Sequence, residues 1–211
     1  MNNQESSIIR IEPTESMVSL TWMLGTRCNY DCMYCAPANH DNTSPHPKIE
    51  KLLLAWENFY TRVSPMGLPI KISFTGGEVT ANRGFLPLVK HLRNGDYNIG
   101  QIIVTTNGSA SVNYYQQLAA LVDAISFSTH SEFFNEAVFF NKIIKIDKLM
   151  IRPNKSVHVN IMDEPWNIDR TLMYQELLIK HNISHSVNKI NFSKQIRTYH
   201  LQKGVKNLDT L

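Results

Sequence analysis

Three cysteines lie close together in the segment "CNYDCMYC". They are Cys28, Cys32 and Cys35, spaced C-x-x-x-C-x-x-C, and the chain contains no other cysteine. Thiolates are ligands for soft metals and for iron–sulfur clusters. Three thiolates can each bind one iron of a [4Fe–4S] cluster, which leaves the fourth iron with an open coordination site. An open site on a bound metal is where chemistry takes place, as in catalytic zinc sites.

The triplet alone leaves other interpretations open. A structural zinc site would take a fourth ligand from His40 or His46. A simple electron-transfer protein is less favoured, because it would normally supply a fourth cysteine to its cluster. A disulfide framework is disfavoured by the odd number of cysteines.

A second candidate segment is Gly76–Gly77–Glu78. Two adjacent glycines allow a ligand to approach the backbone closely. The carboxylate that follows them is suited to accept hydrogen bonds from an ammonium group. Taken without its neighbours, this segment is better explained as an ordinary turn between a strand and a helix. Its position, one strand and one helix after the cysteines, makes it informative.

The elements that must position these residues alternate between short apolar strands and amphipathic helices. The expected strands are Met17–Gly25, Ile70–Phe74, Gln101–Thr106, Ala124–Ser128, Ser156–Met162 and Ser184–Ile190. The expected helices are Ile49–Val63, Arg83–Asn94 (with Pro87 in its first turn), Asn113–Val122, Asn135–Met150 and Asn167–His181.

Such alternation implies right-handed crossovers and a parallel sheet. Five or six strand–helix units are too few for a complete eight-unit barrel, which leaves an open sheet or a partial barrel. We therefore predict an α/β fold, a partial (βα)6 barrel of parallel strands with outer helices. Residues 17–190 would form this core, preceded by an N-terminal extension, residues 1–16, and followed by a polar tail, residues 191–211.

In folds of this kind, ligands bind at the carboxyl ends of the strands. The cysteines follow the first expected strand, and "TGGEVT" follows the second. The segments "TNGS", "STHSE" and "MDEP" follow the next three strands. Five polar or glycine-bearing segments are therefore expected to converge at one end of the sheet.

The two signatures carry a family resemblance. "CNYDCMYC" resembles the cluster motif of the radical S-adenosylmethionine enzymes, C-x-x-x-C-x-aromatic-C, with Tyr34 at the aromatic position. The Gly76–Glu78 segment resembles the second signature of that family. Counting the order of strands and helices, the resemblance covers roughly Met17 to Ile190.

The resemblance implies a [4Fe–4S] cluster and S-adenosylmethionine as cofactors. The three cysteines would ligate the cluster, and the amino and carboxylate groups of S-adenosylmethionine would chelate the fourth iron. Tyr34 would help to place the adenine. Gly76, Gly77 and Glu78 would hold the methionyl ammonium.

The remaining cofactor contacts implied by the resemblance lie on later strands. Ser126 and Ser128 share one face of their strand and would contact the ribose, although serines on strands are more often structural. Asn160 lies on the strand that packs against adenine in the family. Asn107 would reach the ribose or the carboxylate, but Asn107–Gly108 is also a common turn pair.

The activity implied by the resemblance is radical chemistry. The cluster would cleave S-adenosylmethionine reductively, and the 5′-deoxyadenosyl radical would abstract hydrogen from a small-molecule substrate. Flavodoxin or ferredoxin would supply the electron, because three cysteines provide for one cluster only. Two alternatives stay open. One is an activating enzyme that forms a glycyl radical on a partner protein, and the other is a non-catalytic zinc or iron–sulfur protein.

His130 is the best candidate for a catalytic residue that faces the substrate. It follows the expected ribose-binding strand, and histidine titrates near neutral pH. Further polar residues at strand ends or after the cysteines are equally explained as solvated loop residues. They are His40, Asp41, Glu132, Asp163, Glu164 and Lys189.

Composition sets the outer limits. Of 211 residues, 43% are hydrophobic and 18% charged, which is typical of a soluble globular protein. The net charge of +3 makes nucleic acid an unlikely partner. No apolar run approaches the roughly 20 residues that span a bilayer, and the polar N-terminus lacks a secretory signal. We therefore expect a cytoplasmic protein without a membrane partner.

Overall fold

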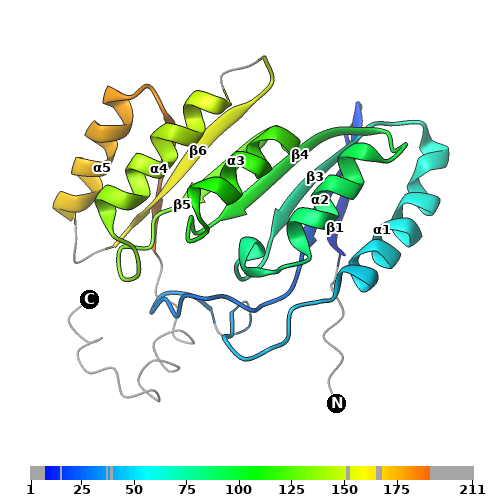
Figure 1. Ribbon diagram of the computed structural model, residues 1–211, viewed down its shortest axis with the longest axis horizontal. Coiled ribbons are helices and arrows are strands. Elements are labelled where there is room, and N and C mark those ends of the chain that lie inside the picture. Colours follow the sequence, from blue (N-terminus) through cyan, green and yellow to red (C-terminus); the bar gives the residue numbers. More distant parts are fainter. Residues whose placement is uncertain are drawn as a thin grey trace.

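The protein is described by a computed structural model covering residues 8–14, 16–36, 38, 40–150, 153–164 and 168–190. Within these residues the strands form one mixed sheet, which the helices accompany (Figure 1). The strands are β1 (Ile8–Thr14), β2 (Met17–Met23), β3 (Ile70–Thr75), β4 (Ile99–Thr106), β5 (Ala124–Ser128), β6 (Ser156–Asp163) and β7 (Ser184–Lys189). The α-helices are α1 (Ile49–Val63), α2 (Phe85–Asn94), α3 (Val112–Leu121), α4 (Glu136–Leu149) and α5 (Ile168–Lys180).

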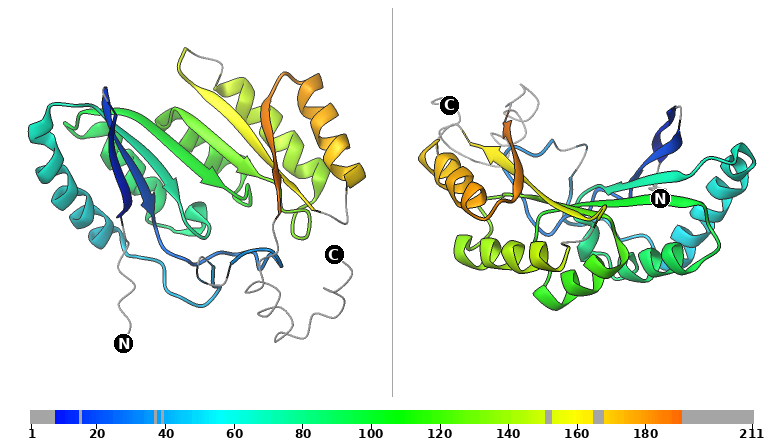
Figure 2. Two further views of the ribbon diagram at one scale, coloured as in Figure 1. Left: turned by 180° about the vertical axis from the view of Figure 1, so that it is seen from behind. Right: turned by 90° about the horizontal axis from the view of Figure 1, so that it is seen from above.

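The strands lie in the sheet in the same order as in the sequence, from β1 to β7. Strands β2 to β7 run parallel, and β1 pairs antiparallel with β2. Because every parallel crossover advances in the same direction, the helices gather on one face of the sheet, and the sheet curves away from them (Figure 2). This arrangement confirms the predicted partial barrel of parallel strands with outer helices.

Strand β1 is the element that the sequence patterns did not reveal. It falls within residues 1–16, which we expected to form an extension. Pro13 lies inside it, and a proline within a run of residues argues against a strand in the interior of a sheet. β1 tolerates this proline because it is an edge strand, paired with β2 alone. The predicted tail, residues 191–211, lies outside the described residues.

The hydrophobic core fills the layer between the sheet and the helices. Alternate residues of the parallel strands point into it, and Trp22, Ile72 and Phe127 are each at most 2% exposed. Trp22 stacks on Trp56 of α1, with ring centroids 6.2 Å apart. The residues between them point to the opposite face, which the helices leave uncovered. Strands of a parallel sheet are usually covered on both faces and therefore apolar on both. Here only one face is covered, which explains why apolar and polar residues alternate.

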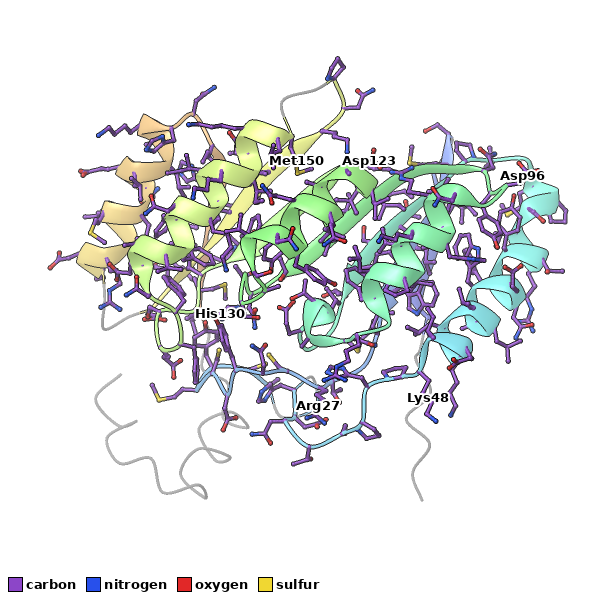
Figure 3. The ribbon with its side chains drawn as sticks, in the orientation of Figure 1. Arg27, Lys48, Asp96, Asp123, His130 and Met150 are labelled. Atoms are coloured by element: carbon purple, nitrogen blue, oxygen red, sulfur yellow. The ribbon has the colours of Figure 1, made fainter. Side chains whose placement is uncertain are left out.

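The candidate segments lie at the carboxyl ends of the strands. Figure 3 shows Arg27 and His130 at this end of the sheet, and Asp96, Asp123 and Met150 at the opposite end. The connection between β2 and α1, which carries the cysteines, runs across the same end (Figure 1). The helices in the described part of the chain are all too short or too polar to cross a membrane.

Candidate functional site

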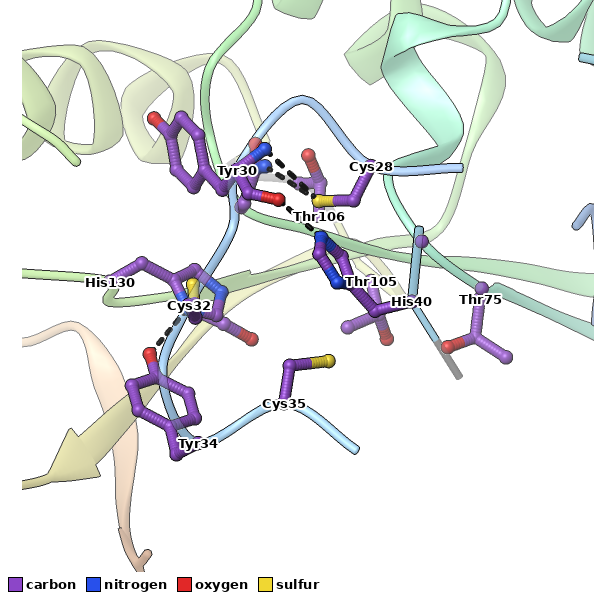
Figure 4. Close-up of a pocket in the computed structure, with 14 residues that line it drawn as sticks. Cys28, Tyr30, Cys32, Tyr34, Cys35, His40, Thr75, Thr105, Thr106 and His130 are labelled. Carbon is purple, nitrogen blue, oxygen red and sulfur yellow. Dashed lines mark hydrogen bonds between the residues drawn. The ribbon is translucent and has the colours of Figure 1, made fainter. Parts of the chain in front are cut away.

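A cavity opens where the cysteine-bearing connection passes over the ends of β3, β4 and β5 (Figure 4). Its volume is about 180 Å³. All three cysteines line it. The other lining residues are Tyr30, Tyr34, His40, Thr75, Gly76, Gly77, Thr105, Thr106, Asn107, Ser128 and His130.

The cysteine-bearing loop is closed at its base by Asp41. The Asp41 backbone N–H donates to the carbonyl of Thr26 at 3.0 Å, and the Asp41 carbonyl accepts from the N–H of Cys28 at 2.7 Å. Its carboxylate accepts from the Thr26 hydroxyl at 2.5 Å and from the N–H groups of Thr43 and Ser44 at 2.9 and 2.5 Å. Burial opposes ionisation, but these hydrogen bonds hold the pKa of the carboxyl below its usual range. Asp41 therefore shapes the loop and does not line the cavity.

The thiols lie in surroundings that keep them protonated until a metal binds. Burial raises the pKa of all three, that of Cys35 to about 11. Reactive cysteines need the opposite, a lowered pKa from nearby positive charge. Metal ions displace thiol protons directly, so this environment fits ligands better than nucleophiles.

The arrangement of the thiols fits a cluster better than a single ion. Within the described residues, no three His, Cys, Asp or Glu side chains converge closely enough to hold one metal ion. His46, one of the two fourth ligands considered for zinc, does not line the cavity, whereas His40 does. A [4Fe–4S] cluster presents a separate iron to each thiolate, so its ligands need not meet at one point.

The two glycines of the second segment pack against the loop that carries the cysteines. Gly77 N–H donates to the carbonyl of Gly25 and Glu78 N–H to that of Arg27, both at 2.9 Å. A β carbon on Gly77 would lie 2.1 Å from the Arg27 carbonyl oxygen, and one on Gly76 would lie 2.5 Å from that of Gly25. Gly76 also has a φ of +133°, which strongly favours glycine. The close approach that glycine permits here is to the backbone of the cysteine loop.

Glu78 is almost fully buried, with 2% of its surface exposed, and it is not one of the lining residues. One carboxylate oxygen accepts from the N–H and the hydroxyl of Thr80 at 2.9 and 2.6 Å and from the hydroxyl of Thr106 at 2.7 Å. The other accepts from the Asn107 N–H at 2.6 Å. Burial raises the pKa of the carboxyl, although these hydrogen bonds oppose the rise. The side chain joins the end of β3 to the end of β4.

His130 reaches across from the end of β5 to the cysteine loop. Its Nδ1 lies 2.5 Å from the Tyr34 hydroxyl oxygen and 3.4 Å from the Cys32 sulfur. The rings of Tyr34 and His130 stack at 5.9 Å with an angle of 12° between their planes. Burial lowers the pKa of the imidazole to about 4, so it is neutral at physiological pH.

The other residues predicted to bind S-adenosylmethionine divide into two groups. Asn107 and Ser128 line the cavity. Ser126 and Asn160 do not; Asn160 donates to the Ser126 hydroxyl at 2.8 Å and accepts from Ser186 of β7 at 3.2 Å. This bridge joins three neighbouring strands on the uncovered face. The cofactor contacts predicted for all four residues remain predictions.

The remaining candidates for substrate contacts take varied positions. Glu132 accepts from the N–H of Met33 at 3.3 Å, and Glu164 accepts from the Ser131 hydroxyl at 2.5 Å. Asp163 accepts from Thr171 of α5 at 2.9 Å. Lys189 is exposed at the end of β7. None of these four residues lines the cavity.

Four lining residues were absent from the sequence-based candidates: Tyr30, Thr75, Thr105 and Thr106. Tyr30 lies between Cys28 and Cys32, where its N–H donates to the Cys28 sulfur at 3.4 Å. The threonines end β3 and β4. Their place at the carboxyl ends of strands was the signal available in the sequence.

The fold and the site together define a class of protein, a partial parallel barrel with a three-cysteine loop and a glycine-paired segment at the carboxyl ends of its strands. Together with the relatives described next, they support membership of the radical S-adenosylmethionine superfamily, which the motifs predicted. The cofactors of this superfamily are a [4Fe–4S] cluster and S-adenosylmethionine.

Two relatives share about a third of aligned residues with the chain. A probable GTP 3′,8-cyclase from Thermoplasma volcanium is 31% identical over 124 residues, which are 58% of this chain and 35% of the relative. The GTP 3′,8-cyclase of Pasteurella multocida is 32% identical over 127 residues, 57% of this chain and 34% of the relative. The matches thus span only about a third of these relatives. No family model matches the chain.

Solved structures show the same fold. SuiB from Streptococcus suis superposes with a TM-score of 0.61 at 15% sequence identity, over 92% of this chain and 47% of SuiB. A second SuiB structure, bound to S-adenosylmethionine, superposes with a TM-score of 0.55 at 14% identity, over 89% of this chain and 44% of that one.

Proposed function

We propose that this protein is an enzyme that cleaves S-adenosylmethionine reductively and abstracts hydrogen from a small-molecule substrate. The observation that carries the proposal is the convergence of Cys28, Cys32 and Cys35 on one cavity, beside the Gly76–Gly77 backbone. Superfamily membership supports the chemistry.

Different residues of the cavity would bind the cluster and S-adenosylmethionine. Cys28, Cys32 and Cys35 hold the cluster along the loop side of the cavity. When bound, the cluster would supply the electron for the reductive cleavage of S-adenosylmethionine, the chemistry that precedes hydrogen abstraction from the substrate.

The opposite side of the cavity holds S-adenosylmethionine. The backbone of Gly76 and Gly77 lines the cavity at the end of β3, where it would contact the methionyl group. Asn107 and Ser128 present polar side chains from the ends of β4 and β5. The protein orients both cofactors and keeps water and oxygen away from the radical.

The electron comes from outside the chain. All three cysteines lie in one loop and line one cavity, so the chain provides thiolates for one cluster. We propose flavodoxin or ferredoxin as the reductant. The substrate is a small molecule, and GTP is the first compound to test, because the relatives at 31% and 32% identity are named for reactions of GTP.

The test is anaerobic reconstitution with iron and sulfide, followed by incubation with dithionite and S-adenosylmethionine. We expect the absorbance of a [4Fe–4S] cluster and the release of 5′-deoxyadenosine. A Cys28→Ala/Cys32→Ala/Cys35→Ala variant should show neither. A protein that binds zinc alone, or a loaded cluster that releases no 5′-deoxyadenosine, contradicts the proposal. Incubation with GTP deuterated at successive ribose carbons then tests GTP through deuterium transfer to 5′-deoxyadenosine.

A further inference from the structure

Each cysteine sulfur has its own hydrogen-bonding environment. The Cys28 sulfur accepts from the backbone N–H of Tyr30 at 3.4 Å and from the Asn107 side chain at 3.8 Å, and the Ala36 N–H hydrogen-bonds the Cys35 sulfur. At Cys32 the partners are two side chains from different parts of the chain. The Tyr34 hydroxyl hydrogen-bonds the Cys32 sulfur, and the Nδ1 atom of His130 lies 3.4 Å from it. The Tyr34 and His130 side chains therefore form the hydrogen-bonding environment of the Cys32 sulfur.

The three polar atoms form a closed triangle. The Tyr34 hydroxyl oxygen lies 2.5 Å from His130 Nδ1, and both contact the Cys32 sulfur. A free thiol can donate its proton within this triangle. A thiolate that ligates iron has no proton, so it can only accept. Once Cys32 is a ligand, the protons of the triangle must point toward its sulfur.

One assignment of the protons satisfies all three atoms. The Tyr34 hydroxyl has one proton, which it donates to the Cys32 sulfur. The tyrosine oxygen then accepts from Nδ1–H of His130, so the imidazole carries a proton on Nδ1. The ring stacking of Tyr34 on His130, at 5.9 Å, holds the pair in this orientation. The result is a chain of two hydrogen bonds that ends on one ligand of the cluster.

We propose that Tyr34 and His130 are positioning residues that direct this hydrogen-bond chain to the Cys32 sulfur and raise the reduction potential of the cluster. The proposal rests on the proposed function. Hydrogen bonds to cluster sulfurs stabilise the extra negative charge of the reduced state, so they make reduction easier. His130 thereby acts through Tyr34 and Cys32, in place of the direct contact with substrate that its position in the sequence suggested.

The experiment measures the midpoint potential of the reconstituted full-length protein by anaerobic redox titration, followed by electron paramagnetic resonance. Tyr34→Phe keeps the stacked ring and removes the hydroxyl. His130→Phe keeps a ring and removes the donor, and His130→Gln restores an N–H donor. We expect a more negative potential in both phenylalanine variants and a potential between theirs and that of the wild type in His130→Gln.

Phe133→Leu is the matched control, because Phe133 stacks on Tyr30 at 5.0 Å beside the same site without a side-chain hydrogen bond. It should retain the wild-type potential. Fully loaded Tyr34→Phe and His130→Phe proteins with wild-type potentials overturn the proposal. So does a loss of cluster that Phe133→Leu shares equally, because packing alone would explain it. A loss confined to the two phenylalanine variants supports the positioning role. Failure of the wild type itself to assemble a cluster overturns the proposed function instead.

Discussion

Gly77 lies against Arg27 so closely that a β carbon on Gly77 would be 2.1 Å from the Arg27 carbonyl oxygen. The contact joins the end of β3 to the loop that begins just before the first cysteine. Two backbone hydrogen bonds of 2.9 Å flank it, from Gly77 to Gly25 and from Glu78 to Arg27. The second signature thus supports the first one physically, because the glycines form the surface on which the cysteine loop rests.

Gly77→Ala should therefore disrupt the cysteine loop. The methyl group cannot avoid backbone atoms at this distance, so the loop must move or the fold must lose about 3 kcal/mol or more. The measurements are urea denaturation and iron content after reconstitution. Gly100→Ala is the control, since its nearest neighbour is the Pro69 side chain at 3.2 Å. A Gly77→Ala protein with wild-type stability and iron content would show that the contact has no such role.

Glu78→Gln should destabilise the fold. The carboxylate accepts four hydrogen bonds, and an amide places a donor against at least one of the donors around it. Leaving a buried donor without an acceptor costs about 1 to 3 kcal/mol. Urea denaturation measures the loss. Glu50→Gln, on the exposed surface of α1, is the control and should change stability little. Equal stabilities for the Glu78→Gln variant and the wild type would contradict the buried network.

Lys142 of α4 hydrogen-bonds the loop that follows β4. Its ammonium donates to the carbonyls of Gly108 and Ala110, each at 2.6 Å, and lies 5.6 Å from the centroid of the Tyr115 ring. Lys142→Met removes the donor from two carbonyls, the buried one of Gly108 and the half-buried one of Ala110, and should cost about 1 to 3 kcal/mol. Thermal unfolding measures the cost, with the exposed Lys145→Met on the same helix as the control. If both variants melt alike, the two hydrogen bonds do not stabilise this loop.

The stability of the iron-free chain should fall at acidic pH because of His130. Burial lowers its pKa to about 4, below the ordinary value of 6.5, so the unfolded chain binds this proton more readily than the folded chain. The contribution is complete above pH 6.5 and is lost as the pH falls toward 4, by at most about 3 kcal/mol. Urea denaturation of His130→Gln should show a flatter pH dependence over this window. The exposed His181→Gln should follow the wild type, and a His130→Gln curve parallel to the wild type would refute the assignment.

Local patterns in the sequence predicted the parallel strands and their helices well. The alternation of apolar residues located β2 through β6, and the structure shows capping residues where two of the helices begin. Ser111 accepts from the Tyr114 N–H at the start of α3, and Asn135 accepts from that of Val138 at the start of α4. The sequence patterns did not predict strand β1, because its pairing with β2 depends on the neighbouring strand and not on its own periodicity.

The sequence by itself determined the thiolate set, the glycine pair and the end of the sheet where both lie. Spacing and strand order are local properties, so they can be read without coordinates. Only the tertiary structure decided what each side chain contacts. It turned the Glu78 carboxylate toward Thr106 and Asn107, and it brought His130 from the end of β5 to Tyr34 and Cys32, almost 100 residues earlier in the chain. Such contacts depend on how separate strand ends pack together, and no local pattern specifies that packing.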